Sequence, residues 1–588
     1  MQLDRRSRIP ALFCSLAVLV CALISRPYAS MGICDDGPYI LVAQKLAVTG
    51  HIAYNGWSAA MLVWQLYLGA AFIKLFGFSF TSVRMSTLLV AVALAFFLQR
   101  VLVLAGITER NATFGTLALV LSPLYLLLSV TFMSDIHGLF AVVLCLYGCL
   151  RALRSPSARS TIAWLCFAVV ANTVCGTSRQ LAWLGVLVIV PCTLWLMRDR
   201  RRVLLGGLAV TLAGILFILG GLAWLSHQPY TTPEKLAIHF RQISFRHVAS
   251  LFLAFFLELP FLLLPVMAIF LFAFRKSRTR IKFLIGGLLI LFLVLATYPT
   301  QLLHHFSWYL QPTLRDSPGC DWVTIHGEYE SVSYGLPPLF VPLWLQGLLS
   351  AVSFGGGIGL ILSFFRLREM HGSSVDSPPT ISWRELGILL GPFTAAYIVL
   401  LLFRATSVAN DNTGILFDRY ALGILVVALI CLLRIFQERI QPRIPLAGAI
   451  VVFLMAVYGV VITHNTFALY RARVAVVAEL SQANVPETSV DNGWEYNIVA
   501  ELHHANHDNN PGIVLPAHAY VPTPPPGPGN CSMVYYDETP HIHPLYTVSF
   551  DTNACYGPAP FAPVHYSRWL AASPGTLYVV KYTALAKP

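Results

Sequence analysis

Apolar runs of about bilayer length recur along this chain and constrain its fold more than any other feature of the sequence. A helix needs about 20 mostly apolar residues to cross the hydrocarbon layer. Of all residues 57% are hydrophobic and 11% are charged, whereas about a quarter of a soluble protein is charged. The sequence therefore predicts a polytopic α-helical membrane protein and excludes a large soluble enzyme. We expect about thirteen transmembrane helices, near residues 9–25, 85–106, 112–131, 136–150, 160–176, 181–197, 203–225, 248–274, 283–299, 337–365, 386–403, 420–436 and 444–463.

Basic residues predict which side of the membrane each loop faces. Cytoplasmic loops are enriched in Lys and Arg. If the N-terminus is cytoplasmic, the loops on that side hold 23 of the 39 Lys and Arg residues, including the run at 198–202. We therefore expect a cytoplasmic N-terminus and an extracytoplasmic C-terminus. The net charge of +12 then reflects membrane topology, and no nucleic-acid partner is expected.

The first apolar run also fits a second interpretation. Tyr28-Ala29-Ser30 resembles the small-residue cleavage site of a signal peptide, so the run near 9–25 is either a retained first helix or a cleaved leader. A retained helix places a long outer loop, near 26–84, directly after a membrane anchor.

The composition changes sharply after residue 463, where Asn, His, Pro and Tyr replace Leu and Val. We expect two domains, a transmembrane domain at 1–463 and a small extracytoplasmic α/β or mostly β domain at 464–588. Alternating apolar residues at 532–536 and 576–580 predict strands in this second domain. Cys531 and Cys555 both lie in it, and an oxidising compartment would permit a disulfide between them.

An acidic pair, Asp35-Asp36, opens the first outer loop and is its most informative feature. Two adjacent carboxylates repel each other, which raises the pKa of at least one of them unless a cation lies nearby. A carboxylate of that kind suits a general base. The pair equally fits a helix cap, because Pro38 follows where a first helical turn would begin. Local sequence leaves both interpretations open.

Further charged residues lie at predicted helix ends on the same side of the membrane. Asp135 sits in the tight turn before the fourth predicted helix, Arg179 between the fifth and sixth, and Arg419 at the start of the twelfth. Glu258 lies inside the eighth predicted helix, and an intramembrane carboxylate is a functional candidate by default. An N-cap for Asp135 and an interfacial anchor for the arginines are the structural alternatives.

These motifs together resemble a known family. Behind the acidic pair come Tyr39-x-x-x-Ala43-x-x-Leu46, a Gly-His at 50–51, the amphipathic segment 64–76, and the turn Phe132-Met133-Ser134-Asp135. The order is similar to that of the GT-C superfamily of polyprenyl-phosphate-sugar-dependent glycosyltransferases, in the branch of protein O-mannosyltransferases and the lipid A aminoarabinose transferase. The chain departs from it at Asp36, where the family has Glu, and at His137, where a proline is usual.

The resemblance implies a role for each of these residues. Asp35 matches the general base, Asp36 would orient the acceptor or tune its neighbour, and Asp135 matches a second acidic motif beside the active site. An arginine fork suits the phosphate of the leaving lipid. The expected phosphate ligands are Arg179, Arg419 and Tyr420, the expected cavity residues are Tyr54, His137 and Glu258, and neither a metal nor another cofactor is required.

The function that follows is an inverting glycosyltransferase of the bacterial cytoplasmic membrane. It would move a sugar from a polyprenyl-phosphate carrier to a hydroxyl of a glycan, lipid or protein on the extracytoplasmic side. The segment 64–76 would lie in the lipid interface. The alternative is a transporter or flippase of lipid-linked sugars, which should show paired halves that this sequence lacks.

Overall fold

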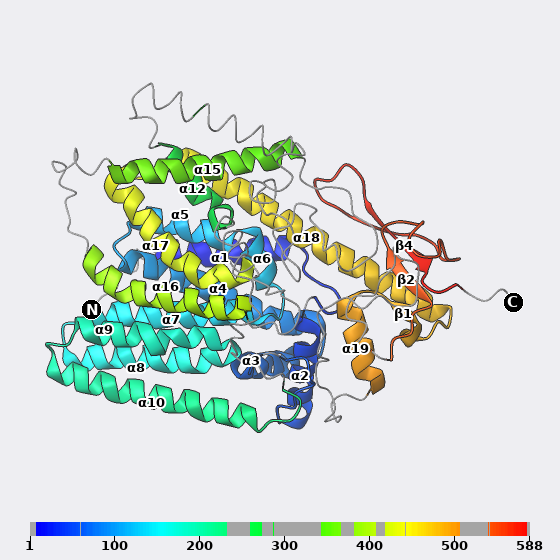
Figure 1. Ribbon diagram of the computed structural model, residues 1–588, viewed down its shortest axis with the longest axis horizontal. Coiled ribbons are helices and arrows are strands. Elements are labelled where there is room, and N and C mark those ends of the chain that lie inside the picture. The colour runs from blue at the N-terminus through cyan, green and yellow to red at the C-terminus, as the bar shows by residue number, and fades with distance from the viewer. Residues whose placement is uncertain are drawn as a thin grey trace.

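The structure is a computed structural model that describes residues 8–33, 35–58, 60–231, 259–272, 286, 343–365, 381–406, 418–441, 443–505, 539 and 541–584. Within these ranges the protein is mostly helical, with a small sheet near its C-terminus (Figure 1). The helices are α1 (Ile9–Ile24), α2 (Asp36–Thr49), α3 (Val63–Phe76), α4 (Phe80–Leu104), α5 (Glu109–Val120), α6 (Pro123–Ser129), α7 (Ser134–Leu153), α8 (Ala158–Cys175), α9 (Val190–Leu196), α10 (Arg201–Ser226), α12 (Leu264–Phe270), α15 (Leu343–Phe365), α16 (Trp383–Thr406), α17 (Leu422–Arg439), α18 (Leu446–Gln482) and α19 (Trp494–Ala505).

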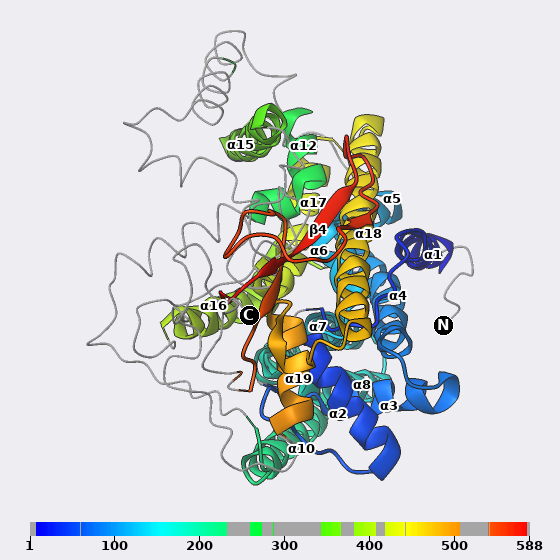
Figure 2. The same ribbon diagram turned by 90° about the vertical axis from the view of Figure 1, so that its right-hand side faces the viewer.

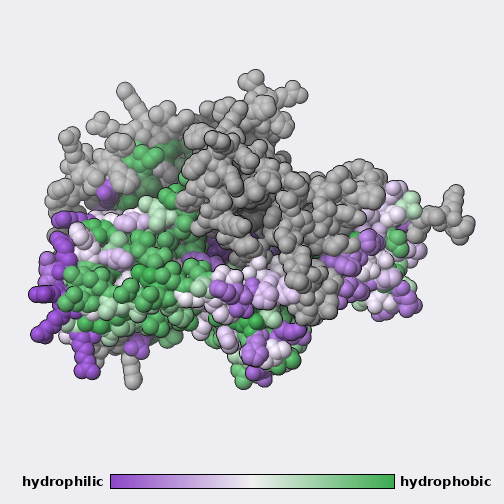
Figure 3. All heavy atoms as spheres, turned by 60° about the horizontal axis from the view of Figure 1, so that its bottom comes forward, coloured by the Kyte–Doolittle hydropathy of each residue, from purple (hydrophilic) through white to green (hydrophobic). Residues whose placement is uncertain are grey.

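Seven of the described helices are long and apolar enough to cross a membrane, or eight if α5 and α6 count as one span. The predicted helices near 248–274 and 283–299 lie largely outside the described residues. Apolar side chains form a broad band over the face that carries α8 and α10, and hydrophilic residues gather at one end of it (Figure 3). The leucines that α10 exposes in this band lie three or four residues apart, at Leu205, Leu208, Leu212, Leu216 and Leu219. The band has the composition of a lipid-facing surface.

The N-terminal helix packs within the bundle. α1 lies against α4 and α5, and the Ser15 hydroxyl donates a hydrogen bond to the carbonyl of Val92 at 2.8 Å. Its other side exposes apolar residues such as Leu12, Phe13 and Leu16. α1 therefore behaves as a structural member of the membrane domain.

Two predicted spans are broken in the structure. The third, near 112–131, divides into α5 and α6, which meet at 69°. The break falls at Ser122-Pro123, where the Ser122 hydroxyl caps α6 by accepting from the Tyr125 amide. The sixth begins as a 3-10 helix (Gln180–Trp183) and a π-helix (Gly185–Ile189) before α9. The buried Asn172 amide bonds the Ala141 and Ala182 carbonyls and accepts from the Val186 amide, which satisfies backbone groups at this irregular start.

The helix α18 connects the helix bundle to the C-terminal sheet. Its 37 residues extend about 55 Å, well beyond the roughly 30 Å of a hydrocarbon layer. It runs without interruption past residue 463, where we expected a domain boundary. Figure 1 shows it leaving the bundle and ending beside the sheet.

The C-terminal sheet packs on the far half of α18. Its strands are β1 (Val490–Asp491), β2 (Tyr546–Ser549), β3 (Val564–Tyr566) and β4 (Gly575–Lys581), in the order β1-β2-β4-β3, with only β1 and β2 parallel. Val548 pairs with Val579, and both pack with Leu577 against Leu469 and Val476 of α18. The strand predicted at 576–580 is confirmed, and the one at 532–536 lies outside the described residues. Cys555 forms a disulfide, whereas Cys531, its expected partner, lies outside them as well.

A buried ion pair joins α18 to α19. Arg473 and Glu495 are almost wholly shielded from solvent, with 3.2 Å between guanidinium and carboxylate. The Tyr470 hydroxyl donates to the same carboxylate, and Arg473 also bonds the Asn492 side chain. α19 in turn lies beside α2 of the first loop (Figure 2), and Trp494 packs edge-on against Trp57 with ring centroids 5.3 Å apart.

We expect Arg473→Met to lower the free energy of unfolding by about 3–5 kcal/mol, because it leaves the Glu495 carboxylate buried without its cation. Thermal unfolding of the detergent-solubilised protein measures this. Arg471→Met is the matched control, since Arg471 lies on the same helix but donates to surface carbonyls of Arg26 and Tyr28. The double change Arg473→Met with Glu495→Gln should recover part of the loss. An equal loss of stability in Arg473→Met and Arg471→Met would contradict the prediction.

Candidate active site at one end of the helix bundle

The two aspartates of the first loop point to different surroundings. Asp35 occupies the N-cap position of α2, but its side chain makes no capping hydrogen bond. Asp36 is fully buried in the first turn, and its Oδ1 accepts from the Ile33 amide at 2.6 Å. The Asp36 carboxylate therefore binds the chain that precedes α2 and does not cap the helix.

Asp36 is the centre of a buried network. The Arg84 guanidinium, at the start of α4, grips it through Nε to Oδ2 at 2.7 Å and through a terminal nitrogen to Oδ1 at 3.0 Å. Both side chains have no exposed surface. Arg84 also donates to the carbonyls of Ala29 and Met31, and the Phe132 amide donates to Asp36 at 3.1 Å. The network joins the first loop, α4 and the turn before Asp135.

Asp35 faces outward from that network. About a third of its side chain, 35%, is exposed, and the nearest cation is the Arg419 guanidinium at 3.8 Å. Burial raises the pKa of the Asp35 carboxyl, Arg419 lowers it, and the negative charges of Asp135, Glu495 and Asp36 raise it further. The net direction is upward. Because the side chain is partly open, solvent or a substrate can reach it and the shift is smaller than full burial would give.

Asp135 lies between the two predicted arginines. Arg179 contacts its Oδ1 at 2.6 Å, and the Arg419 Nε lies 3.9 Å from Oδ2. Only 1% of the Asp135 side chain is exposed. The structure thus brings together Asp35, Asp135, Arg179 and Arg419, which come from four separate segments of the chain. The two contacts of Arg419 are longer than a hydrogen bond, whereas that of Arg179 is a close ion pair.

Neighbouring helices fix the two guanidinium groups. The Arg179 stem lies on Gly138 of α7, where an added Cβ would be 3.0 Å from its Cβ. The Tyr420 ring lies beneath both arginines, with centroids 4.9 Å from the Arg179 guanidinium and 5.6 Å from that of Arg419. The Tyr397 hydroxyl of α16 holds this turn by donating to the Tyr420 carbonyl at 2.9 Å. These contacts hold both guanidinium groups over the Tyr420 ring.

Of the three predicted cavity residues, two have no contact with this cluster among the described residues, and the third is not described. Tyr54 is buried in the first loop and donates to the Met61 carbonyl. His137 is buried one turn into α7, where Nε2 meets the Thr87 hydroxyl at 3.3 Å and the ring packs edge-on against Phe132. Glu258 lies outside the described residues. The described residues hold no group of three or more His, Cys, Asp and Glu side chains placed to bind a metal ion.

Sequence reasoning did not assign a role to Arg84, Tyr397 or Glu495. Arg84 carried one signal, because an arginine at the start of an apolar helix needs a partner once it is buried. Tyr397 lies in an apolar helix with no polar pattern, and Glu495 is more than 450 residues from Asp35 along the chain. Nothing local indicated that either would reach this site.

No protein-family model matches the chain, and no curated protein matches it in sequence. Solved structures do resemble it. ArnT from Cupriavidus metallidurans bound to undecaprenyl phosphate is 14% identical, with a TM-score of 0.39 over 97% of this chain and 98% of that one. The apo state of that ArnT is 17% identical, with a TM-score of 0.39 over 83% and 84%.

The S. cerevisiae protein O-mannosyltransferase Pmt1-Pmt2 complex bound to the sugar donor is 13% identical, with a TM-score of 0.29 over 38% of this chain and 33% of that one. An oligosaccharyltransferase from Archaeoglobus fulgidus is 14% identical, with a TM-score of 0.33 over 81% and 60%. At TM-scores below 0.5 these similarities fix the role of no residue. The proteins found are glycosyltransferases of the GT-C superfamily, the family that the motifs of the first loop resemble.

Proposed function

We propose that this protein is an inverting membrane glycosyltransferase that moves a sugar from a polyprenyl-phosphate donor to an acceptor hydroxyl. The observation that supports it is the meeting of an accessible carboxylate, Asp35, with two arginines, Arg179 and Arg419, at one end of an apolar bundle. A base and a phosphate-binding fork are the two groups that this reaction needs.

Asp35 is the better base of the acidic pair. Its carboxylate is partly exposed and its ion pair with Arg419 is long, at 3.8 Å, so it can accept a proton from an incoming hydroxyl. Asp36 has both oxygens engaged by Arg84 and by backbone amides, and it has no surface through which an acceptor could reach it. We assign Asp36 and Arg84 a positioning role: they hold the first loop against the turn that carries Asp135.

The proposed reaction is a single displacement. The acceptor oxygen attacks the anomeric carbon while its proton passes to Asp35, and the bond from that carbon to the phosphate oxygen breaks. The phosphate leaves with the electron pair, and Arg179 and Arg419 stabilise its charge. Attack on the face opposite the leaving group inverts the configuration. Asp135 keeps the two guanidinium groups on one side.

Sidedness follows from the charge distribution. The cluster lies at the end of the bundle that faces the C-terminal sheet, and the arginine run at 198–202 lies at the other end. From the positive-inside rule we infer that the reaction takes place outside the cytoplasmic membrane of a bacterium, with residues 464–588 as an outer domain. The donor reaches the site through the lipid, and the acceptor reaches it from the outside.

The first test separates the two aspartates. We expect Asp35→Asn to lower sugar transfer about 100- to 10,000-fold, the usual contribution of a general base, with an unchanged unfolding temperature. Asp36→Asn should instead lower the free energy of unfolding by about 3–5 kcal/mol, because Arg84 loses its buried partner. The assay uses purified protein, a panel of radiolabelled polyprenyl-phosphate sugars and total envelope acceptor. Donor binding without transfer by the wild type would favour a transporter or flippase instead.

The pH dependence gives a second prediction. Transfer needs the deprotonated Asp35 carboxylate, so activity is present above its pKa and lost as the pH falls through it. Since burial raises this pKa above the usual 3.8, the acidic limb of the rate profile should lie at a higher pH than an ordinary aspartate gives. Arg419→Gln should move the limb higher still, because the guanidinium lowers the pKa. Lys74→Gln, which removes an exposed charge on α3, should leave the limb in place.

The third prediction concerns the donor phosphate. Arg419→Ala and Arg179→Ala should each weaken donor binding about 10- to 100-fold, since a hydrogen bond to a charged group contributes about 1.5–3 kcal/mol. Arg419→Lys keeps the charge but not the fork, so it should recover only part of the affinity. Equilibrium binding of the labelled donor measures this. Unchanged affinity in both alanine variants would remove the arginines from the phosphate site.

A further inference from the structure

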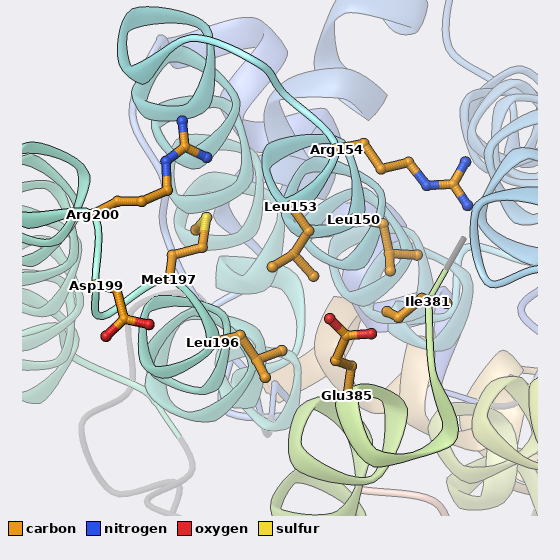
Figure 4. A pocket seen from close by; sticks show the side chains of 9 residues that line it. All are labelled: Leu150, Leu153, Arg154, Leu196, Met197, Asp199, Arg200, Ile381 and Glu385. Atoms are coloured by element: carbon orange, nitrogen blue, oxygen red, sulfur yellow. The ribbon is translucent and has the colours of Figure 1, made fainter. Parts of the chain in front are cut away.

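A second site lies at the opposite end of the bundle. A pocket of about 290 Å³ opens between the end of α7, the segment that joins α9 to α10, and the start of α16. Asp135 and Leu153 are 18 residues apart on α7, so this pocket is about 27 Å from the candidate active site. Its lining residues are Leu150, Leu153, Arg154, Leu196, Met197, Asp199, Arg200, Ile381 and Glu385 (Figure 4).

The lining of the pocket separates two signs of charge. In Figure 4 the guanidinium groups of Arg154 and Arg200 lie above Leu153 and Met197, and the carboxylates of Asp199 and Glu385 lie below them. Arg154 and Arg200 donate to the carbonyls of Leu104 and Ser155, which holds their stems at the rim.

The carboxylates remain available on the other side. Glu385 accepts from the amide and the hydroxyl of Ser382 through Oε2 alone. Among the described residues no ion pair joins Arg200, Asp199 or Glu385 to one another. Arg200 and the two carboxylates are therefore not neutralised by each other, and they match a ligand that carries an anion and a cation a short distance apart.

Residues typical of the membrane–water interface flank the pocket. Trp195 and Trp383, which flank it in sequence, are 60% and 38% exposed. The Trp195 ring centroid lies 5.1 Å from the Arg198 guanidinium, and the Trp383 ring centroid lies 4.6 Å from the Arg434 guanidinium. Exposed tryptophans with neighbouring arginines are typical of the interface between membrane and water. The inner wall of leucines and Met197 continues into the apolar helices, as the glycerol and acyl part of a lipid requires.

We propose that this pocket binds the head group of a phospholipid that carries a phosphate and a primary ammonium, from the leaflet at the arginine-rich end of the bundle. The phosphate lies against Arg154 and Arg200, which offer fixed forks of donors. The ammonium donates to Glu385 and Asp199. A head group with a quaternary ammonium cannot make those hydrogen bonds, and an anionic head group leaves the carboxylates without a partner.

The test is a lipid titration of the full-length protein in detergent, read as the shift in unfolding temperature and as retained lipid in native mass spectrometry. Phosphatidylethanolamine should bind about tenfold more tightly than phosphatidylcholine or phosphatidylglycerol, the loss expected for one charge-assisted hydrogen bond. Glu385→Gln should remove the preference for the ethanolamine lipid, since glutamine keeps the contact with Ser382 but not the charge. Arg200→Gln should weaken binding of the same lipid.

Arg202→Gln is the matched control, because Arg202 is an exposed residue of the same basic run that does not line the pocket. It should leave the preference intact. Equal binding of all three lipids, or the same loss in the control, would overturn the proposal. Soluble glycerophosphoethanolamine should not compete, and competition by it at the affinity of the lipid would overturn the assignment to a membrane lipid.

Discussion

The buried pair of Asp36 and Arg84 is the interaction on which the candidate site depends. Removing two charges from water is costly, and the cost is offset only when every donor and acceptor finds a partner. Here those partners are backbone groups of residues 29–33 and of Phe132, so the pair can be satisfied only when three segments have met. Burial of Asp36 therefore also fixes the position of the neighbouring residue, Asp35.

The same logic explains how two adjacent aspartates acquire different chemistry. Successive residues at the start of a helix point about 100° apart, so one side chain enters the protein and its neighbour leaves it. Asp36 receives a full set of donors and stays a structural anion. Asp35 is partly desolvated beside other carboxylates, with one guanidinium 3.8 Å away, and there its carboxyl holds a proton more readily. The local sequence did not distinguish the two carboxylates, because nothing in it says which one meets Arg84.

Much of the fold could be read from the sequence, because hydrophobic length is a local property. Helices α4, α7, α8, α10, α16 and α17 lie where apolar runs predict them. The predicted helices near 112–131 and 181–197 were wrong in detail, because local backbone geometry interrupts an apolar run of sufficient length. Ser122-Pro123 divides one run, and the π-helix at 185–189 replaces the start of another. Of the site, the charged residue types at predicted helix ends could be read from the sequence, and their side of the membrane stays a prediction. Their grouping could not be read from it, since it joins the first loop to residues near 135, 179 and 419 through contacts that no local pattern encodes.

The length of α18 has a mechanical consequence. A single unbroken helix links the helix bundle to the core beneath the sheet, so the C-terminal sheet moves with this helix as a lever arm and has no hinge within it. A transmembrane helix adjusts to bilayer thickness by tilting, and a tilt of α18 displaces the sheet and α19 in proportion to their distance from the membrane. α19 packs against α2 of the first loop. A change in bilayer thickness that tilts α18 would therefore also shift the segment around Asp35.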